Sequence, residues 1–288
     1  MNDTHEATPP PVWSALRRSG LHCAVAQLAH PLDAYARLQA LRQFLCPVDM
    51  WRFVEFSAVL GAYAGEPTVL DLGSPRLLAR HLAREHNARV LACDIAPAIA
   101  DEMRVYRRGI GRKHLVGLRA DGIHLPFASG SIPFAYSVSV IEHIAGEGDR
   151  EALSELQRVL KPEGRLVVTV PCAPTHEEIW LESDIFGAQA RREDGKVFFC
   201  RLYDWETARE RLMAVSGLRV TGVEAWQVRD ADSFQEYQRL TANPRSLASI
   251  RAKWNDFRHA HSLLERCTPF EDPIAARGVM AITFQSES

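Results

Sequence analysis

The sequence predicts an α/β fold, a doubly wound parallel sheet preceded by a helical cap, and two observations lead to this prediction. Between residues 68 and 171, short apolar runs typical of buried strands alternate repeatedly with helical patterns. Connections this short indicate parallel strands with helices on both faces of the sheet. Before residue 68 only helical patterns occur. A chain of 288 residues can bury one core of this kind in a single domain.

The N-terminal part is expected to form the cap. Residues 1–12 are polar, end in a run of prolines and are expected to be disordered. Helical patterns follow at 13–30, 32–45 and 50–63, so that residues 13–66 form a helical cap. The remaining chain, 67–288, is expected to form the sheet domain.

The first strand is expected at residues 68–72, where an apolar run ends in Gly73. Ser74 is then expected to cap the next helix and Pro75 to be its first residue. Up to residue 171 we expect strands at 89–95, 115–120, 132–141 and 165–171, and helices at 97–112 and at 150–160, the latter capped by Asp149.

The C-terminal part has a less regular pattern. The charge-rich region 172–196 is expected to be a lid or insertion over the edge of the sheet. Beyond it we expect strands at 196–202, 218–228 and 278–284, a helix at 204–215, and a mostly helical segment at 233–267 broken at Asn243-Pro244.

Composition and charge restrict the expected partners. The chain holds 34 Lys and Arg against 36 Asp and Glu, a formal net charge of −2, without long runs of like charge. Nucleic acid and membrane surfaces are therefore not expected as partners, because binding to either usually uses clustered basic residues. The N-terminus has no apolar signal core, and no run approaches the ~18 apolar residues of a membrane span. We therefore expect a cytoplasmic protein.

The six cysteines do not predict a metal centre. They lie far apart and form no Cys-x-x-Cys pair, whereas zinc and iron–sulfur sites usually use closely spaced pairs. We expect reduced, buried thiols and no bound metal.

Acidic residues follow successive strands of the expected sheet, and ligands of parallel sheets bind beyond the carboxyl ends of the strands. Asp94 lies 21 residues beyond Gly73, the spacing at which an acid accepts hydrogen bonds from both ribose hydroxyls. Asp121 could accept a hydrogen bond from an adenine amine, while Gly122 and Ile123 leave room for the ring. The alternative for each acid is a helix cap or a solvated loop residue.

Five short motifs follow one another between residues 69 and 171. They are Val69-Leu70-Asp71-Leu72-Gly73, Ala92-Cys93-Asp94-Ile95, Asp121-Gly122-Ile123-His124-Leu125-Pro126-Phe127, Ser137-Val138-Ser139-Val140-Ile141-Glu142-His143-Ile144 and Leu160-Lys161-Pro162-Glu163-Gly164-Arg165-Leu166. In this order and spacing they resemble the core of class I S-adenosylmethionine (SAM)-dependent methyltransferases, in the methyltransferase type 11 branch that acts mostly on small molecules. The resemblance implies SAM as the cofactor, a small-molecule acceptor, and a mostly parallel, seven-stranded, Rossmann-like sheet whose last strand, 278–284, runs antiparallel.

Site residues follow from the strand ends and the resemblance. His143 is the first candidate for the base that takes a proton from the acceptor, and His176 and Glu142 are the others. A packing or cofactor-shell role is the alternative for His143. The residues expected to bind the cofactor are Asp71, Gly73, Ser74, Asp94, Ile95, Asp121, Gly122, Ile123 and Ser139.

One departure from the family bears on the choice of cofactor. The first loop has Gly73, Pro75 and Leu77 where the family usually has three glycines. A dinucleotide's pyrophosphate needs several free backbone N–H groups, and proline has none. The loop therefore argues against NAD more than against SAM, which has no phosphate.

Three functions are weighed. The first is methyl transfer from SAM to an oxygen or nitrogen nucleophile of a small molecule. The others are SAM binding without methyl transfer, as a partner subunit, as a sensor or in variant SAM chemistry, and an NAD(P)-dependent oxidoreductase. Arg52 and Glu55 are expected to form a surface ion pair, with contact to SAM or substrate as the alternative. A homodimer is left open.

Overall fold

The computed structural model describes residues 11–28, 41, 44, 48–107, 114–183, 192–193, 195–241 and 246–287. The expectations for residues 1–10, for most of the helix predicted at 32–45, and for 184–191 within the predicted insertion lie outside the described residues. Helix α1 (Pro11–Leu28) begins within the segment predicted to be disordered, and proline suits the first turn of a helix.

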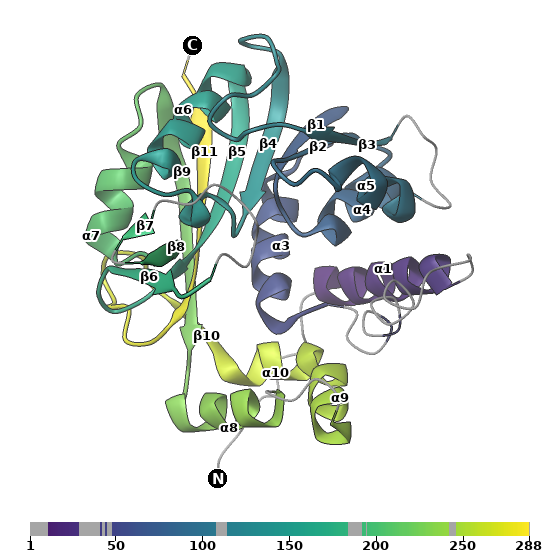
Figure 1. Ribbon diagram of the computed structural model, residues 1–288, viewed down its shortest axis with the longest axis vertical. Helices are drawn as coiled ribbons and strands as arrows, with labels where there is room; N and C mark the ends of the chain where they lie inside the picture. Colours follow the sequence, from purple (N-terminus) through teal and green to yellow (C-terminus); the bar gives the residue numbers. More distant parts are fainter. Residues whose placement is uncertain are drawn as a thin grey trace.

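The described strands form one large sheet in the order β10-β9-β11-β5-β4-β1-β2-β3 (Figure 1). Neighbours from β3 to β5 pair in parallel, and β11 pairs antiparallel with both β5 and β9. The predicted fold class and the antiparallel last strand are therefore confirmed. The strands are β1 (Thr68–Leu72), β2 (Arg89–Asp94), β3 (Leu115–Arg119), β4 (Ile132–Val138), β5 (Leu160–Cys172), β9 (Leu218–Val228), β10 (Leu264–Cys267) and β11 (Gly278–Ser286).

The prediction of seven strands is wrong, because β10 adds an eighth. Residues 264–267 were expected to end a helical segment, but they pair antiparallel with β9 from Leu264↔Val228 to Cys267↔Ala225. The helical segment itself consists of α8 (Ala231–Thr241), α9 (Leu247–Trp254) and α10 (Asp256–Leu263). Short edge strands depend on a distant partner, which a local pattern does not reveal.

Two hydrophobic clusters cover the two faces of the sheet, as a doubly wound fold requires. Along β1, Val69 belongs to one cluster and Leu70 to the other, because successive strand residues point to opposite faces. Helices α1, α3 (Met50–Ala62), α4 (Arg76–Glu85) and α5 (Ile99–Tyr106) cover the first face. Helix α6 (Gly148–Val159) and the turn of α7 (Trp205–Ala208) cover the second, followed by the π-helix η2 (Arg209–Met213).

The N-terminal helices pack against the sheet domain. Trp13 on α1 donates a hydrogen bond from Nε1 to Ser57 Oγ on α3 at 2.9 Å. Ser19 on α1 pairs with His81 Nδ1 on α4 at 2.7 Å. Figure 1 shows α3 standing beside the ends of β4 and β5. Residues of the cap are therefore close to the edge of the sheet where a ligand is expected.

The insertion after β5 forms a second, three-stranded antiparallel sheet in the order β6-β8-β7. Its strands are β6 (Glu177–Leu181), β7 (Arg192–Glu193) and β8 (Lys196–Leu202). The strand predicted at 196–202 is thus present, but it belongs to the insertion. Tyr203, just beyond β8, exchanges backbone hydrogen bonds with Pro171 and Ala173, which joins the insertion to the end of β5.

Two predicted helix caps are wrong. Helix α4 begins at Arg76 after Pro75, and Ser74 makes other contacts. Helix α6 begins at Gly148, so Asp149 lies inside its first turn instead of capping it. In both cases the polar side chain has a partner from a distant segment, as described below.

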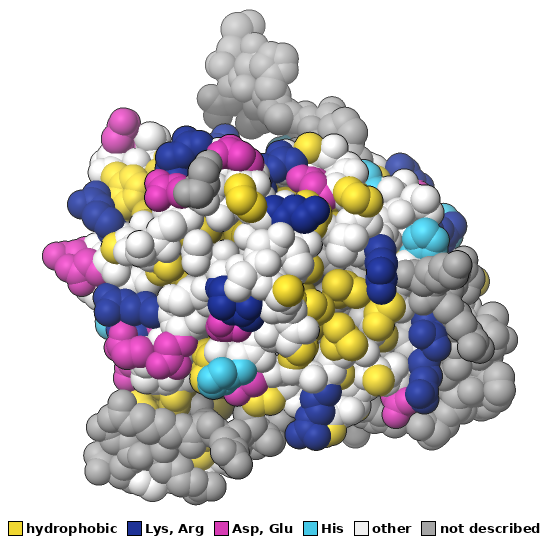
Figure 2. Space-filling view, turned by 90° about the horizontal axis from the view of Figure 1, so that it is seen from above, with side chains coloured by type: hydrophobic (Ala, Val, Ile, Leu, Met, Phe, Trp, Pro, Cys, Tyr) yellow, Lys and Arg dark blue, Asp and Glu magenta, His cyan; other side chains and the backbone are white. Residues whose placement is uncertain are grey.

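Among the described residues, no helix has the length and apolar character needed to cross a membrane. On the face seen in Figure 2, basic and acidic side chains are interspersed.

Candidate functional site

The carboxyl ends of the first three strands meet at one edge of the sheet. Gly73 donates a backbone hydrogen bond to Cys93 O at 2.7 Å, and Ala120 donates one to Asp94 O at 2.9 Å. A Cβ on Gly122 would lie 3.3 Å from Leu72 Cδ1. The structure thus brings together the segments that carry Gly73, Asp94 and Asp121, as the sequence predicted.

The loop after β1 leaves few backbone donors for a ligand. Gly73 has a φ of +66°, and a Cβ there would lie 2.7 Å from Val140 Cγ1, so only glycine fits. Its N–H is bonded to Cys93 O, and the N–H of Ser74 donates to Asp71 Oδ1 at 3.0 Å. Pro75 has no N–H. Three successive positions therefore offer no donor to a phosphate, which favours a ligand without phosphate groups.

Ser74 is buried and connects this loop to β4. Its Oγ accepts a hydrogen bond from Val138 N at 2.9 Å and donates to Leu72 O at 3.3 Å. Asp71 is also fully buried, and burial raises its pKa from 3.8 to about 7 although Arg76 and Ser74 oppose the shift. Both side chains therefore stabilise the loop after β1 through buried hydrogen bonds.

Asp94 is held by a residue that the sequence analysis missed. Arg76 Nη2 contacts Asp94 Oδ2 at 2.5 Å, and Ala96 N donates to Asp94 Oδ1 at 2.8 Å. Arg76 also contacts Glu102 at 2.9 Å. Burial opposes the positive charge of Arg76, but these acids still raise its pKa. Ile95, the next residue, is 49% exposed and could contact an adenine ring.

The loop after β3 is folded back on itself. Asp121 Oδ1 accepts a hydrogen bond from Ile123 N at 3.2 Å, and Asp121 forms an isolated bridge with His124. This turn holds Gly122 against Leu72, so the predicted adenine-side residues share one edge with the loop after β1.

Helix α3 contributes a buried acid to the site. Glu55 Oε1 accepts hydrogen bonds from Ser139 Oγ and from Thr169 Oγ1, the latter at 3.0 Å, while Glu55 Oε2 pairs with Arg52 at 2.6 Å. Glu55 is only 1% exposed. The expected ion pair between Arg52 and Glu55 is present, but its surface location is wrong, because Glu55 is buried and joins the cap to the ends of β4 and β5.

Glu142 lies in the short 3₁₀ helix η1 (Ile141–His143) after β4 and is fully buried. Burial raises its pKa from 4.5 to about 8, the charge of Glu55 adds to the shift, and Arg52 opposes it. Within the described residues, Oε2 of Glu142 has no hydrogen-bond partner. Near neutral pH this carboxyl is therefore largely protonated.

His143 contacts the insertion as well as Glu142. Its Nδ1 lies 2.6 Å from Phe199 O, and its Nε2 lies 3.7 Å from Glu142 Oε1. Burial lowers the pKa of His143 below its ordinary value, although the Phe199 carbonyl opposes this, so the ring is neutral near pH 7. A carbonyl can only accept, so Nδ1 carries the hydrogen and Nε2 the lone pair.

His176 lies elsewhere. Its Nδ1 contacts Leu202 O at 3.0 Å, and its backbone N donates to Asp204 Oδ2 at 3.1 Å. Its ring lies 6.3 Å from that of Tyr203. In the part of the chain that the structure describes, none of these contacts is shared with His143 or Glu142.

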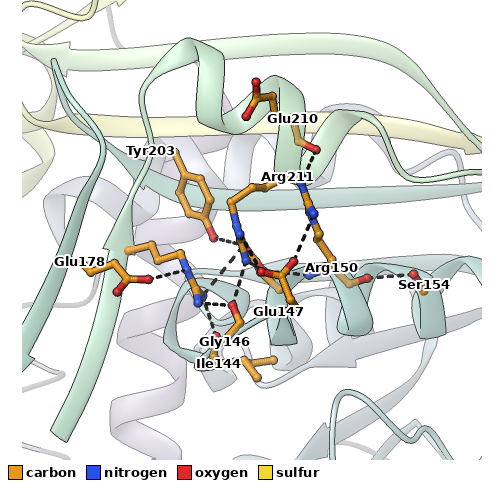
Figure 3. Close-up of polar contacts among 11 residues, drawn as sticks. Ile144, Gly146, Glu147, Arg150, Ser154, Glu178, Tyr203, Glu210 and Arg211 are labelled. Carbon is orange, nitrogen blue, oxygen red and sulfur yellow. Dashed lines mark hydrogen bonds and ion pairs between the residues drawn. The ribbon is translucent and has the colours of Figure 1, made fainter. Parts of the chain in front are cut away.

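A second buried acid, Asp149, belongs to an ion-pair network, and its partners Tyr203 and Arg211 are labelled in Figure 3. It contacts Arg211 at 2.7 Å, the hydroxyl of Tyr203 at 2.9 Å and Arg201 at 3.9 Å. Burial alone would raise the pKa of Asp149, but Arg211, Arg201 and Tyr203 outweigh it, and the pKa is lowered. These partners, distant in sequence, explain why Asp149 does not cap α6.

Elsewhere among the described residues lie a hollow and five cysteines. A hollow of about 340 Å³ lies beside α6 and η2, and its Arg150 and Arg211 already pair with Glu147. Over the described ranges, no group of His, Cys, Asp and Glu could hold a metal ion. The five cysteines there are free and buried.

The comparisons with known proteins agree with this geometry. Residues 70–168 match a family model described as a methyltransferase domain. A demethylmenaquinone methyltransferase from Thermobifida fusca (strain YX) is 36% identical over 118 residues, which are 41% of this chain and 48% of that protein. The matched segment thus spans about half the length of this curated relative.

Solved structures show the same fold. The MccD protein has a TM-score of 0.51 at 13% identity, over 81% of this chain and 96% of that chain. A geranyl diphosphate methyltransferase in complex with SAM has a TM-score of 0.50 at 14% identity, over 91% of this chain and 94% of that chain. Together with the strand order, these findings show that residues 70–168 match a methyltransferase domain and that the chain shares its fold with solved methyltransferases.

Proposed function

We propose that this chain is an enzyme that transfers the methyl group of SAM to an oxygen or nitrogen nucleophile of a small molecule. The observation that carries the proposal is the shared edge of β1 to β4. Its first loop offers no backbone donor at three successive positions, and acids follow the next strands. A pair of proton-transfer groups, Glu142 and His143, follows β4. These groups fit an adenosine without phosphates, because the acids can accept hydrogen bonds from it and the loop has no N–H groups to offer a phosphate.

In this proposal Asp94 accepts hydrogen bonds from the ribose hydroxyls while Arg76 holds its carboxylate. Asp121, Gly122 and Ile123 border the adenine. Ser139 borders the methionine end, and Glu55 fixes its hydroxyl. When bound, SAM supplies an electrophilic methyl carbon, to which the acceptor's lone pair bonds as the carbon–sulfur bond breaks and leaves its electron pair on sulfur.

The proton of the acceptor would pass to His143. With Nδ1 donating to Phe199 O, Nε2 is the basic atom, and its lowered pKa leaves it unprotonated near neutral pH. The carboxyl of Glu142 lies beside Nε2 and is largely protonated near neutral pH, which leaves His143 as the base.

SAM binding without methyl transfer uses the same residues and is the alternative. An NAD(P)-dependent reaction is disfavoured because Gly73, Ser74 and Pro75 have no N–H to offer a pyrophosphate.

Calorimetry with SAM and with S-adenosylhomocysteine tests the cofactor assignment. Asp94→Ala should weaken binding by at least about tenfold, or ~1.4 kcal/mol. Asp101→Ala, which removes an exposed acid on α5, is the matched control and should bind normally. Normal binding by Asp94→Ala would remove the ribose assignment.

Transfer of labelled methyl groups to a panel of amines, phenols and alcohols then tests catalysis. One methylated product excludes the binding-only alternative. SAM binding without any product across the panel favours it.

A further inference from the structure

Three residues of the insertion, at every second position, contact the loop that carries the proposed base. The Phe199 carbonyl accepts from His143 Nδ1, and the two rings lie 5.0 Å apart. Arg201 Nη1 donates to Ile144 O at 2.7 Å. The Tyr203 hydroxyl donates to Asp149 at 2.9 Å. Alternate side chains of a strand share a face. Strand β8 and the residue after it therefore lie along residues 143–149, from the end of η1 to the first turn of α6.

Arg201 is the strongest of these contacts. Its side chain is 2% exposed, and it donates to two backbone carbonyls, Ile144 O and Gly146 O. The charge is balanced by Glu178 at 3.4 Å and Asp149 at 3.9 Å. Figure 3 labels three of these partners, Ile144, Gly146 and Glu178. A buried guanidinium with two carbonyl acceptors fixes both position and orientation of a turn.

This turn immediately follows His143. If residues 144–146 shift, the ring of His143 moves relative to the Phe199 carbonyl, which selects the Nδ1–H form of the imidazole. Which nitrogen of His143 carries the hydrogen therefore depends on contacts made by the three-stranded sheet of the insertion.

We propose that Arg201 is a positioning residue, which holds the η1–α6 loop so that the Phe199 carbonyl keeps the lone pair of His143 on Nε2. The catalytic consequence of this inference rests on the proposed function, in which His143 is the base. The geometric consequence, the form and environment of the imidazole, does not.

The test compares Arg201→Met, which removes the donors, with Arg201→Lys, which keeps the charge but cannot contact both carbonyls in a fixed fork. Arg150→Met is the matched control, because Arg150 is an exposed arginine of α6 whose guanidinium donates to Glu147 and to Glu210 O. Nitrogen-15 NMR of the histidine side chains reports the tautomer and pKa of His143 in each protein, and calorimetry reports S-adenosylhomocysteine binding.

In the wild type and in Arg150→Met we expect the Nδ1–H tautomer and a pKa below the ordinary value of 6.5. In both Arg201 variants the pKa should move towards 6.5 with a mixture of tautomers, while kcat falls about tenfold and the affinity for S-adenosylhomocysteine stays the same. Arg201→Lys decides the question if Arg201→Met does not fold.

An unchanged tautomer and pKa of His143 in the folded variants would overturn the inference. A changed imidazole with unchanged kcat would keep Arg201 as a positioning residue but remove His143 as the base. Failure of the wild type to bind S-adenosylhomocysteine would overturn the proposed function alone, because the NMR result would still decide the role of Arg201.

Discussion

Glu142 in η1 and Asp149 in the first turn of α6 are both buried, yet their environments differ. Asp149 is bonded to Arg211 and Tyr203, with Arg201 near, and these partners lower its pKa although burial opposes them. Glu142 has one oxygen without a hydrogen-bond partner among the described residues, and burial raises its pKa to about 8. The two acids therefore carry different charges at neutral pH.

The difference shows that burial alone does not decide what an acid does. An ionised acid with cationic partners holds segments together, as Asp149 does between α6, η2 and the insertion. A buried acid without such a partner keeps its proton and can exchange it near neutral pH. The following variants test this contrast, starting with the largest expected effect.

Asp149→Ala should lower the free energy of unfolding by about 3–5 kcal/mol, because it leaves Arg201 buried without this acid. Urea unfolding measures the loss. Glu147→Ala is the control, since Glu147 also pairs with Arg211 but is 57% exposed, and it should cost at most about 1 kcal/mol. Equal losses in the two variants would show that Asp149 has no special role.

The pH dependence of stability should differ in direction for the two acids. For Glu142 the folded pKa is raised, so its contribution is fully present below pH 4.5 and is lost as the pH rises through about 8. For Asp149 the folded pKa is lowered, so its contribution is present above pH 3.8 and is lost as the pH falls through the folded pKa.

Glu142→Gln should remove the loss of stability between pH 4.5 and about 8 that is due to Glu142. Thermal unfolding across this range, compared with the wild type, measures it. The wild-type reference is essential because burial also raises the pKa of Asp71, to about 7. Parallel curves for variant and wild type would contradict the assignment.

Glu55→Gln should have a smaller effect, a fall in the pKa of Glu142, because the charge of Glu55 is one of the causes of the raised value. Carbon-13 NMR of labelled glutamate side chains would follow the titration. Glu66→Gln, which removes an acid paired with Arg165, should leave the pKa of Glu142 unchanged. A pKa of Glu142 that stays at the wild-type value in Glu55→Gln would show that the two acids are not coupled.

The smallest expected change is that of Thr169→Val, which keeps the shape of the side chain and removes one of the donors to Glu55. A loss of about 1 kcal/mol in the free energy of unfolding is expected. Urea unfolding can resolve it against Thr221→Val, whose exposed hydroxyl contacts Thr283 O and should contribute less. If Thr169→Val costs no more than the control, Glu55 is held by its other partners.

The strands could be predicted where the pattern is local. The apolar run of β1 and the bounds of β9 follow from residues 68–72 and 218–228 themselves. The four residues of β10 form a strand only because β9 lies beside them. Their own pattern continues the preceding helices.

The candidate site was predictable to the same extent. Strand ends place Asp94 and Glu142 because the order of strands decides their position. The partners Arg76, Arg201 and Arg211 could not be found, because each meets its acid across a turn or between distant segments. For Glu55, the neighbouring Arg52 on the same helix suggests a surface pair, and only the contacts with Ser139 and Thr169 reveal its burial.

The place of β11 in the sheet has a consequence for biogenesis. It lies between β5 and β9 although it follows both in the chain, so these two strands cannot be joined until residues 278–286 have left the ribosome. Until then the edges of β5 and β9 stay open to pairing with other chains. Because closure of long loops is slow, we expect the union of the two sheet halves to come late and to be the step at which nascent chains most need a chaperone.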